Sequence, residues 1–484
     1  MMVRGKQRYR RIAIIACVAP LAGLPVTGNA ASVLYRTYKG GTGQDLNPDV
    51  DFDSSLRMVV AGQTQSASDI ATLGAYDTSL GGTQDGFVAQ YTSGGLLNWS
   101  TYYGGSGLDA FASVVHDSSG RIYAGGYTES TSGVALNWGA ITAHQGTLGG
   151  GRDGMLTRFD SSGTAIWSTY FGGLGNDEIT GVCVASDGSV FATGYTESTT
   201  QIALNATHHM ALSSSTDGFI AKFNSSGTLL WSTYYGGNAH TASVNCAVDS
   251  LGSVIIVGHT YATTGIHKLG WDAVYDGARD GFLAKLSSAG GWTWGSYYGG
   301  TAQELLSGVA VDSSDAIYIA GGTDSLNAAS AIAGGVGAND TTPNGGTDGF
   351  YARFTPLGVR SFGSYYGDTG FDDFHDISVL GTSLFMIGTT DSTMNIATAG
   401  SLDTSFNGGL FDGMFIVSPT AGGAPTYGMY LGGTSNDYGD GIVARSTNEV
   451  ALVSTTGSSG IATAGAPDTS FGGALDVFLE RIKM

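Results

Sequence analysis

Three aspartates at alternate positions, Asp49, Asp51 and Asp53, have the spacing that begins a calcium-binding loop. Such loops bring several carboxylate and carbonyl oxygens to one hard cation. However, the glycine that lets such a loop turn is absent here, and Pro48 directly precedes the series. Two interpretations therefore stay open: a calcium site formed by the three aspartates, or a solvated strand edge facing a central channel.

Two further sets of acidic residues recur along the chain. The first set is Asp45, Asp109, Asp177, Glu304, Asp372 and Asp437, with Thr241 at the equivalent position of one repeat. These carboxylates either accept N–H groups of their own glycine-rich loops or form a ring that binds cations or a cationic ligand. The second set is Asp85, Asp153, Asp217, Asp280, Asp348, Asp412 and Asp476. Seven equivalent residues indicate turn or strand-entry positions, because a catalytic centre needs an asymmetric arrangement.

The most irregular segments hold the remaining candidate residues. Trp138 and His144 lie in the segment 131–151, and His208 and His209 lie in 201–216. Recognition usually resides in loops on a rigid scaffold, so we expect these to be ligand-binding loops. An adjacent histidine pair can ligate metal, although consecutive side chains rarely converge on one ion. The sequence has no nucleophile elbow, zinc-ligand spacing or phosphate-binding loop, so we expect no catalytic residue and no cofactor other than calcium.

The elements that position these residues come from a repeat. Seven glycines that follow an aromatic-rich strand lie 63 to 68 residues apart, and a fixed period of this kind is typical of a repeat architecture. In the second repeat, short apolar runs at 113–116, 121–128, 153–159 and 166–171 alternate with hairpin turns and one longer polar loop. This pattern predicts a four-stranded antiparallel meander.

Meanders repeated radially form a β-propeller, and the two ends of the chain indicate how its ring closes. Residues 33–38 have a fourth-strand sequence, whereas 476–482 have a third-strand sequence. We therefore predict an all-β, seven-bladed propeller of four-stranded antiparallel blades, spanning 31–484 as one domain. The N-terminal strand should join the C-terminal blade, so that no blade edge is left unpaired.

The repeated motifs resemble a known family. Trp-Ser-Thr-Tyr-Tyr-Gly-Gly at 231–237, the Asp-x-x-Gly turns, Gly-Tyr-Thr-Glu-Ser at 126–130 and Asp-Gly-Phe at 217–219 are similar to the seven-bladed β-propeller repeat (SBBP) of secreted and surface bacterial proteins. The resemblance covers essentially the whole chain after residue 30. It implies a propeller and export, and it implies no reaction.

The N-terminal segment supports export. Five arginines and lysines precede an uncharged apolar stretch at 12–24, and small residues follow near Ala30. We expect 1–30 to be a secretory signal peptide that is cleaved near Ala30, which would place the protein in the periplasm, at the cell surface or outside the cell. A lipoprotein signal ending at Cys17 and a twin-arginine signal at 10–11 are alternatives.

Charge and cysteine content limit the partners. Without the signal, 15 basic residues oppose 40 acidic ones, so we expect no nucleic-acid partner, no membrane insertion and a monomer. Cys183 and Cys246 occupy consecutive repeats and should face each other across two blades. They either form a disulfide in an oxidising compartment or are two small buried apolar residues.

Three functions fit these observations. The first is an exported, non-catalytic binding scaffold for a protein, glycan or cell-surface polymer. The second is an extracellular polymer-degrading lyase or hydrolase with its site at the channel mouth, which should gather non-repeating polar residues there. The third is a passive envelope component.

Overall fold

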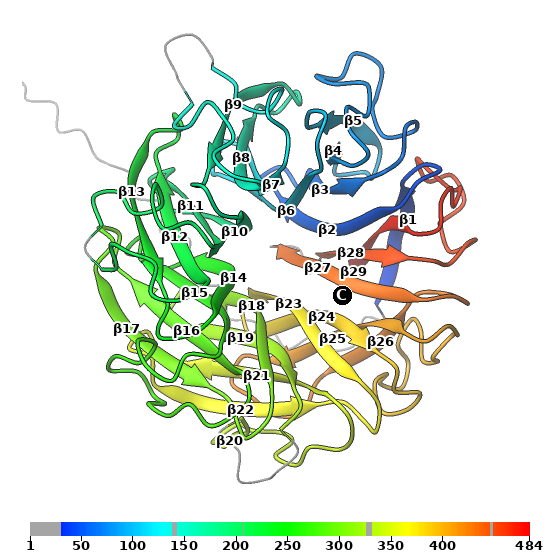
Figure 1. Ribbon diagram of the computed structural model, residues 1–484. Coiled ribbons are helices and arrows are strands. Elements are labelled where there is room, and N and C mark those ends of the chain that lie inside the picture. The colour runs from blue at the N-terminus through cyan, green and yellow to red at the C-terminus, as the bar shows by residue number, and fades with distance from the viewer. Residues whose placement is uncertain (1–30, 138–142, 207, 326–331, 446–448) are drawn as a thin grey trace, which may run out of the picture.

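The computed structural model describes residues 31–484 apart from 138–142, 207, 326–331 and 446–448 (Figure 1). Within these residues, seven antiparallel sheets stand as blades around a common axis. The predicted all-β, seven-bladed propeller is therefore confirmed. The described residues contain no helix, and thus no helix long and apolar enough to cross a membrane. The expected signal peptide and Trp138 lie outside the described residues.

Each blade runs from an inner strand at the axis to an outer strand at the rim. Blade 1 comprises β2 (Asp45–Phe52), β3 (Met58–Thr64), β4 (Asp85–Tyr91) and β5 (Leu97–Tyr103), and blade 2 comprises β6 (Asp109–His116), β7 (Ile122–Thr128), β8 (Asp153–Phe159) and β9 (Ala165–Phe171). Blade 3 comprises β10 (Asp177–Val184), β11 (Val190–Thr196), β12 (Asp217–Phe223) and β13 (Leu229–Tyr235), and blade 4 comprises β14 (Thr241–Val248), β15 (Val254–Thr260), β16 (Asp280–Leu286) and β17 (Trp292–Tyr298).

The remaining blades follow the same order with two variations. Blade 5 comprises β18 (Glu304–Val311), β19 (Ile317–Thr323), β21 (Asp348–Phe354) and β22 (Arg360–Tyr366), and a two-residue strand, β20 (Gly334–Gly335), pairs with β22 at its rim. Blade 6 comprises β23 (Asp372–Leu380), β24 (Ser383–Thr390), β25 (Asp412–Pro419) and β26 (Tyr427–Leu431). Blade 7 comprises β27 (Asp437–Arg445), β28 (Glu449–Thr456), β29 (Asp476–Lys483) and β1 (Ser32–Lys39).

Blade 7 is composite, as predicted. β1 pairs antiparallel with β29, from Ser32 opposite Lys483 to Lys39 opposite Val477. The N-terminal strand thus supplies the outer strand that the C-terminal repeat lacks. This pairing closes the ring, so the edge of β29 is covered.

The hydrophobic core lies between blades rather than within one. At the contact of blades 1 and 2, Val59 and Val88 pack with Phe111 and Met155, and each other pair of neighbouring blades has an equivalent cluster. Both faces of the middle strands are therefore covered, which explains why β4 is buried at every position and does not alternate.

The recurrent tryptophans fasten each outer strand to the next blade. Trp99 donates its indole N–H to the carbonyl oxygen of Ser161, at 3.1 Å, in the hairpin turn of blade 2. Gly163 of that turn has φ +86°, and a Cβ there would lie 2.6 Å from the Trp99 ring. Only glycine fits both the backbone angle and the approach of the ring. Trp167, Trp231 and Trp294 make the same contact in the next blades.

Cys183 and Cys246 are joined by a disulfide. Their Cα atoms are 5.9 Å apart, on the inner strands β10 and β14. Of the two alternatives that the sequence left open, the structure therefore shows the cross-link, which ties blade 3 to blade 4.

Candidate functional site

The inner strands of all seven blades bulge at the same level. Register shifts interrupt each inner-strand ladder, for example between Leu46 and Asp49 in β2 and between Phe374 and Asp376 in β23. A bulge re-aims side chains, and here residues from all seven inner strands line a cavity of about 180 Å³ on the axis. We call this cavity the channel waist. Its lining residues are Asn47, Pro48, Asp49, Ala112, Ser113, Thr180, Val244, Asn245, Ser307, His375, Asp376 and Asp440.

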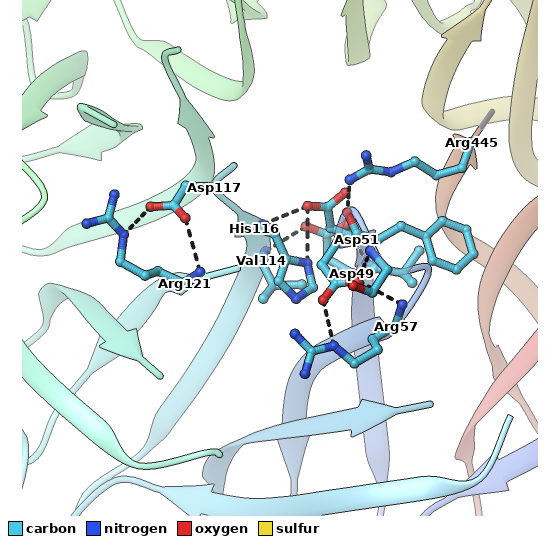
Figure 2. Close-up of polar contacts among 12 residues, drawn as sticks. Asp49, Asp51, Arg57, Val114, His116, Asp117, Arg121 and Arg445 are labelled. Atoms are coloured by element: carbon cyan, nitrogen blue, oxygen red, sulfur yellow. Dashed lines mark hydrogen bonds and ion pairs between the residues drawn. The ribbon is translucent and has the colours of Figure 1, made fainter. Parts of the chain in front are cut away.

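Two of the three alternate aspartates bridge blade 1 to blade 2 at this level (Figure 2). Asp49 accepts the N–H of Val114 at 2.8 Å, and Asp51 accepts the N–H of His116 at 2.7 Å. The His116 Nδ1 atom is also 3.5 Å from the Asp51 carboxylate. An inner strand is the edge of its sheet, so its outward N–H groups need acceptors, and these aspartates supply them.

Asp53 forms its hydrogen bonds within its own hairpin turn. It accepts the N–H groups of Ser55 and Arg57 at 2.8 and 2.9 Å and pairs with the Arg57 guanidinium at 2.6 Å. The three aspartates thus serve three separate sets of donors and do not converge. Among the described residues, no group of three or more histidines, cysteines or acids could hold a metal ion. The calcium site stays a prediction, and the contacts favour joining of the inner strands for Asp49 and Asp51 and holding of a turn for Asp53.

Blades 2 and 6 also have a side chain that accepts an N–H group from the inner strand of the next blade. Ser113 accepts the N–H of Val182 at 3.1 Å, and Asp376 accepts that of Ile442 at 3.0 Å. The acceptor is aspartate in blades 1 and 6 and serine in blade 2. The sequence does not predict that these side chains accept N–H groups of the next inner strand, because no local pattern determines the register between blades.

Three carboxylates make the waist asymmetric. Asp49, Asp376 and Asp440 belong to the consecutive blades 1, 6 and 7. Burial raises the pKa of Asp49 to about 6, of Asp376 to about 8 and of Asp440 to about 7, and the negative charge of Asp49 raises that of Asp376 further. His375, beside Asp376, binds the carbonyl oxygen of Gly439 through Nδ1 at 2.8 Å, and burial lowers its pKa.

The hairpin end of the channel opens into a larger hollow of about 550 Å³. Asp117, Asp249 and Asp312 line it, but each caps its own hairpin turn. Asp249 also pairs with Lys285 at 2.7 Å. These carboxylates are therefore already engaged in holding the turns.

The first recurrent acid set ties down the loops between blades. Asp109 accepts the N–H of Gly105 at 2.7 Å and the hydroxyl of Ser130 at 2.6 Å, and it is fully buried. Equivalent bonds from a loop N–H are made by Asp45, Asp177, Glu304, Asp372 and Asp437. These contacts match the loop-bonding interpretation. The residues do encircle the axis, but their burial leaves no open ring of charge.

The second set lies directly beside the first. A Cβ placed on Gly104 would lie 2.9 Å from Asp85 Oδ1 and 2.6 Å from Asp109 Oδ2, so the two carboxylates flank one glycine. Asp85 also accepts N–H groups of Gly81 and Gly82 at its strand entry. Burial, aided by the charge of Asp109, raises the pKa of Asp85 to about 6. Burial and an acidic partner likewise raise the pKa to about 6 or 7 at Asp153, Asp280, Asp348, Asp412 and Asp476.

The long loops after the second strand of each blade share one backbone path. In every blade, an N–H of the outer strand donates to the same loop carbonyl, at Asp77, Gln145, His209, Asp272, Asp340, Asp403 and Asp468. The preceding residue, which we call the cap, lies above the end of the outer strand. The seven caps are Tyr76, His144, His208, Trp271, Asn339, Leu402 and Pro467.

The predicted loop histidines belong to this arrangement. His144 lies 6.3 Å from the Phe171 ring and His208 lies 5.9 Å from the Tyr235 ring, between ring centroids. His208 also stacks on His209 at 4.0 Å, and burial lowers its pKa to about 3. The two consecutive rings therefore stack on each other. Ligand binding by the loops that hold His144, His208 and His209 stays a prediction.

Comparison with curated proteins gives distant relatives only. No protein-family model matches the chain, so the SBBP resemblance stays a prediction. Regulatory protein FlaEY of Caulobacter vibrioides is 24% identical over 263 residues, which are 50% of this chain and 26% of that protein. An uncharacterized WD repeat-containing protein, L264, of Acanthamoeba polyphaga mimivirus is 26% identical over 142 residues, 27% of this chain and 10% of that protein. The chain spans about a quarter or less of either relative.

Solved structures with a similar chain path are equally distant. A protein of unknown function from Dyadobacter fermentans has a TM-score of 0.42 at 9% identity, covering 94% of this chain and 99% of that one. The WD40 domain of Neurospora crassa Pan2 has a TM-score of 0.42 at 8% identity, covering 93% and 95%. A gluconolactonase of Xanthomonas campestris has a TM-score of 0.31 at 11% identity, covering 74% and 85%. Similarity at this level carries no argument about activity, and the propeller assignment rests on the seven sheets themselves.

Proposed function

We propose that the protein is an exported, non-catalytic binding scaffold that recognises its partner with one face of the disc. This face, which we call the loop face, is formed by the loops after the second and fourth strands of each blade. The ladders place those strand ends together: Asp109 pairs with Thr128, and Thr128 with Asp153. The signal-like N-terminus supports export, and the acidity of the chain supports solubility outside the cell.

The observation that carries this proposal is that the loops share a backbone and differ in their side chains. The same outer-strand bond holds every loop, yet the cap is tyrosine, histidine, tryptophan, asparagine, leucine or proline. Strand positions repeat because blade packing requires it. Variation at rigidly held surface positions is what a recognition surface needs, because little conformational entropy is lost on binding.

The test compares exposed leucines on the two faces. Leu73 and Leu269 lie on the loop face with 105% and 79% exposure, and Leu96 and Leu357 lie on the opposite face with 63% and 74%. The full chain is expressed with a C-terminal tag in its source cells, its N-terminus is determined by mass spectrometry, and the purified protein is titrated onto washed cells. We expect a start near Ala31 and weaker binding for Leu73→Ser and Leu269→Ser. Equal effects of Leu96→Ser and Leu357→Ser, or retention of residues 1–30 inside the cell, would refute the proposal.

An enzyme with its site on the axis is the second candidate, and one observation favours it. The channel waist gathers non-repeating polar residues from all seven blades, and Asp376 and Asp440 have pKa values raised to about 8 and 7, which suits general acids. In that case Asp376→Asn and Asp440→Asn should abolish polymer cleavage without changing cell binding.

A further inference from the structure

The cap and the end of the outer strand fill the gap between neighbouring blades. At the contact of blades 1 and 2, Tyr76 stacks on Tyr103 with ring centroids 6.0 Å apart, and Tyr103 meets Phe159 of the next blade at 5.5 Å. The Tyr103 hydroxyl donates to the carbonyl oxygen of Val134 at 2.8 Å. Tyr235 and Tyr298 make the same bond, to Ile266 at 3.0 Å and Ile332 at 2.6 Å.

The seam between blades 7 and 1 departs from this pattern at three positions. Lys39 stands where the outer strands of blades 1, 3, 4 and 5 end in tyrosine, Pro467 stands at the cap position, and Tyr91 stands where blades 2, 3 and 5 have phenylalanine. Lys39 is 3% exposed, and its Nζ donates to the carbonyl oxygens of Ile70 at 2.6 Å and Asp69 at 2.9 Å. The lysine therefore replaces the tyrosine hydroxyl bond but not the tyrosine ring.

The missing ring leaves a cavity. A pocket of about 320 Å³ opens at the seam, lined among others by Lys39, Tyr91, Leu97, Pro467 and Asp468. This volume lies at the lower end of small-molecule sites, roughly 300–1,000 Å³. We call it the seam pocket. It lies on the loop face, because it is bounded by the loop at 40–42 and by the long loop of blade 7.

The polar groups around the seam pocket carry both signs. Lys39 is a cation, and burial lowers its pKa to about 8 against the opposing charges of Asp468, Asp45 and Asp69. Tyr91 is 1% exposed, and it lines the pocket together with Leu97. Its hydroxyl can donate to or accept from a ligand that occupies the pocket. Blades 2, 3 and 5 lack this hydroxyl, because phenylalanine fills the same place at 159, 223 and 354.

We propose that the seam pocket binds a neutral sugar residue. A sugar hydroxyl accepts a hydrogen bond from Lys39 or Tyr91 and donates one to Asp468, so one type of group satisfies both signs. The C–H faces of the sugar ring suit Leu97, Pro467 and the tyrosine rings. An anionic ligand is disfavoured because Asp69 and Asp468 stand beside the single lysine. The residue is either a free monosaccharide or the end of a longer glycan.

Sugar binding is measured by saturation-transfer NMR and titration calorimetry on the full chain without its signal. The sugars are glucose, galactose, mannose and N-acetylglucosamine at millimolar concentrations. At least one sugar should receive saturation from the wild type. Lys39→Tyr restores the ring found in other blades, so it should keep the melting temperature and abolish binding. Tyr91→Phe removes one hydrogen bond and should weaken binding about fivefold. Tyr103→Phe, which removes a tyrosine hydroxyl at the filled contact of blades 1 and 2, should bind as the wild type does.

Oligosaccharides that end in the preferred sugar distinguish the two sources. Tighter binding than the free sugar assigns a glycan, and equal binding assigns a monosaccharide; either result supports the pocket. No saturation with any of the four sugars, or undiminished binding by Lys39→Tyr, would overturn it. This proposal deepens the scaffold function by naming a ligand class. Its failure would leave the cell-binding test of Leu73 and Leu269 unaffected, so the two can fail separately.

Discussion

Asp109 and Ser130 form a coupled pair whose joint replacement should cost much less than the separate replacements suggest. Blade 4 carries Thr241 and Ala262 at the equivalent positions, so the aspartate and the serine are both missing there. In that blade, the Thr241 hydroxyl bonds Thr260 at 2.9 Å instead. One blade of the protein thus shows how the loop is held without the carboxylate.

The expected magnitudes follow from the lost bonds. Asp109→Thr removes two charge-assisted hydrogen bonds, from Gly105 and Ser130, at about 1.5–3 kcal/mol each. Relief of the repulsion with Asp85 offsets part of this, so we expect a loss of about 3 kcal/mol in the free energy of unfolding. Ser130→Ala removes the bond to Asp109 and the one accepted from Gly107 at 2.8 Å, for about 2–3 kcal/mol. The double variant copies blade 4 and should lose only about 3 kcal/mol. It lacks both groups, so the Ser130 hydroxyl is not left without the Asp109 carboxylate as it is in Asp109→Thr.

A double-mutant cycle measures the coupling. Relative to the wild type, the melting temperature should fall by about 3 °C for Asp109→Thr, about 2–3 °C for Ser130→Ala and about 3 °C for the double variant. These shifts follow because the unfolding entropy of a fold of this size is about 1 kcal/mol per degree. The coupling energy should be about 2–3 kcal/mol. If the double variant loses the sum of the two single losses, then the carboxylate and the hydroxyl act independently, and the blade 4 comparison has no energetic meaning.

Four further predictions concern the whole fold. Reduction of the Cys183–Cys246 disulfide, which closes a separation of 63 residues, should lower stability by roughly 4 kcal/mol, seen as a lower melting temperature in dithiothreitol and matched by Cys183→Ala. Deletion of 32–39 should prevent soluble folding, because it uncovers β29; a monomeric product in gel filtration would contradict this. The melting temperature should be higher at pH 5 than at pH 8, because the folded-state pKa of Asp280 is raised to about 7. The contribution of Asp280 to folding stability is complete below its unfolded pKa near 3.8 and is lost as the pH rises toward 7. Asp280→Asn should flatten the dependence of the melting temperature on pH. Replacing EDTA by millimolar calcium should leave the melting temperature unchanged, because Asp49, Asp51 and Asp53 already serve separate donors, whereas a rise that vanishes in Asp49→Ala would restore the calcium site.

The strands could be read from the sequence because blades repeat and hairpin turns have local signatures. The predicted run at 153–159 is β8, and 33–38 pairs with 476–482 as expected. The role of the first acid set also followed from local chemistry, since Asp109 bonds a glycine only four residues away. Local patterns suffice wherever the partner is near in the chain.

Contacts between blades could not be read in the same way. Asp49 resembles a calcium ligand in sequence, but its partner Val114 is 65 residues away and depends on the register of two blades. The sequence predicts His208 only as a residue of a ligand-binding loop, whereas in the structure its ring packs 5.9 Å from that of Tyr235 and 4.6 Å from that of Trp292. The sequence repeat aligns Lys39 with Tyr103, Tyr235 and Tyr298, but only the structure shows the pocket that lies beside Lys39.

The composite blade also sets the order of events during synthesis. β1 leaves the ribosome before any other strand of the propeller, but its partner β29 is made after all the intervening blades. Until then, β1 has no ladder to join, and blade 7 has no outer strand. An interrupted chain therefore cannot complete the ring at any length, and its exposed edges mark it for proteolysis. The ring thus closes only after β29 has been made, whereas a propeller with each blade built from contiguous chain could complete its blades one by one.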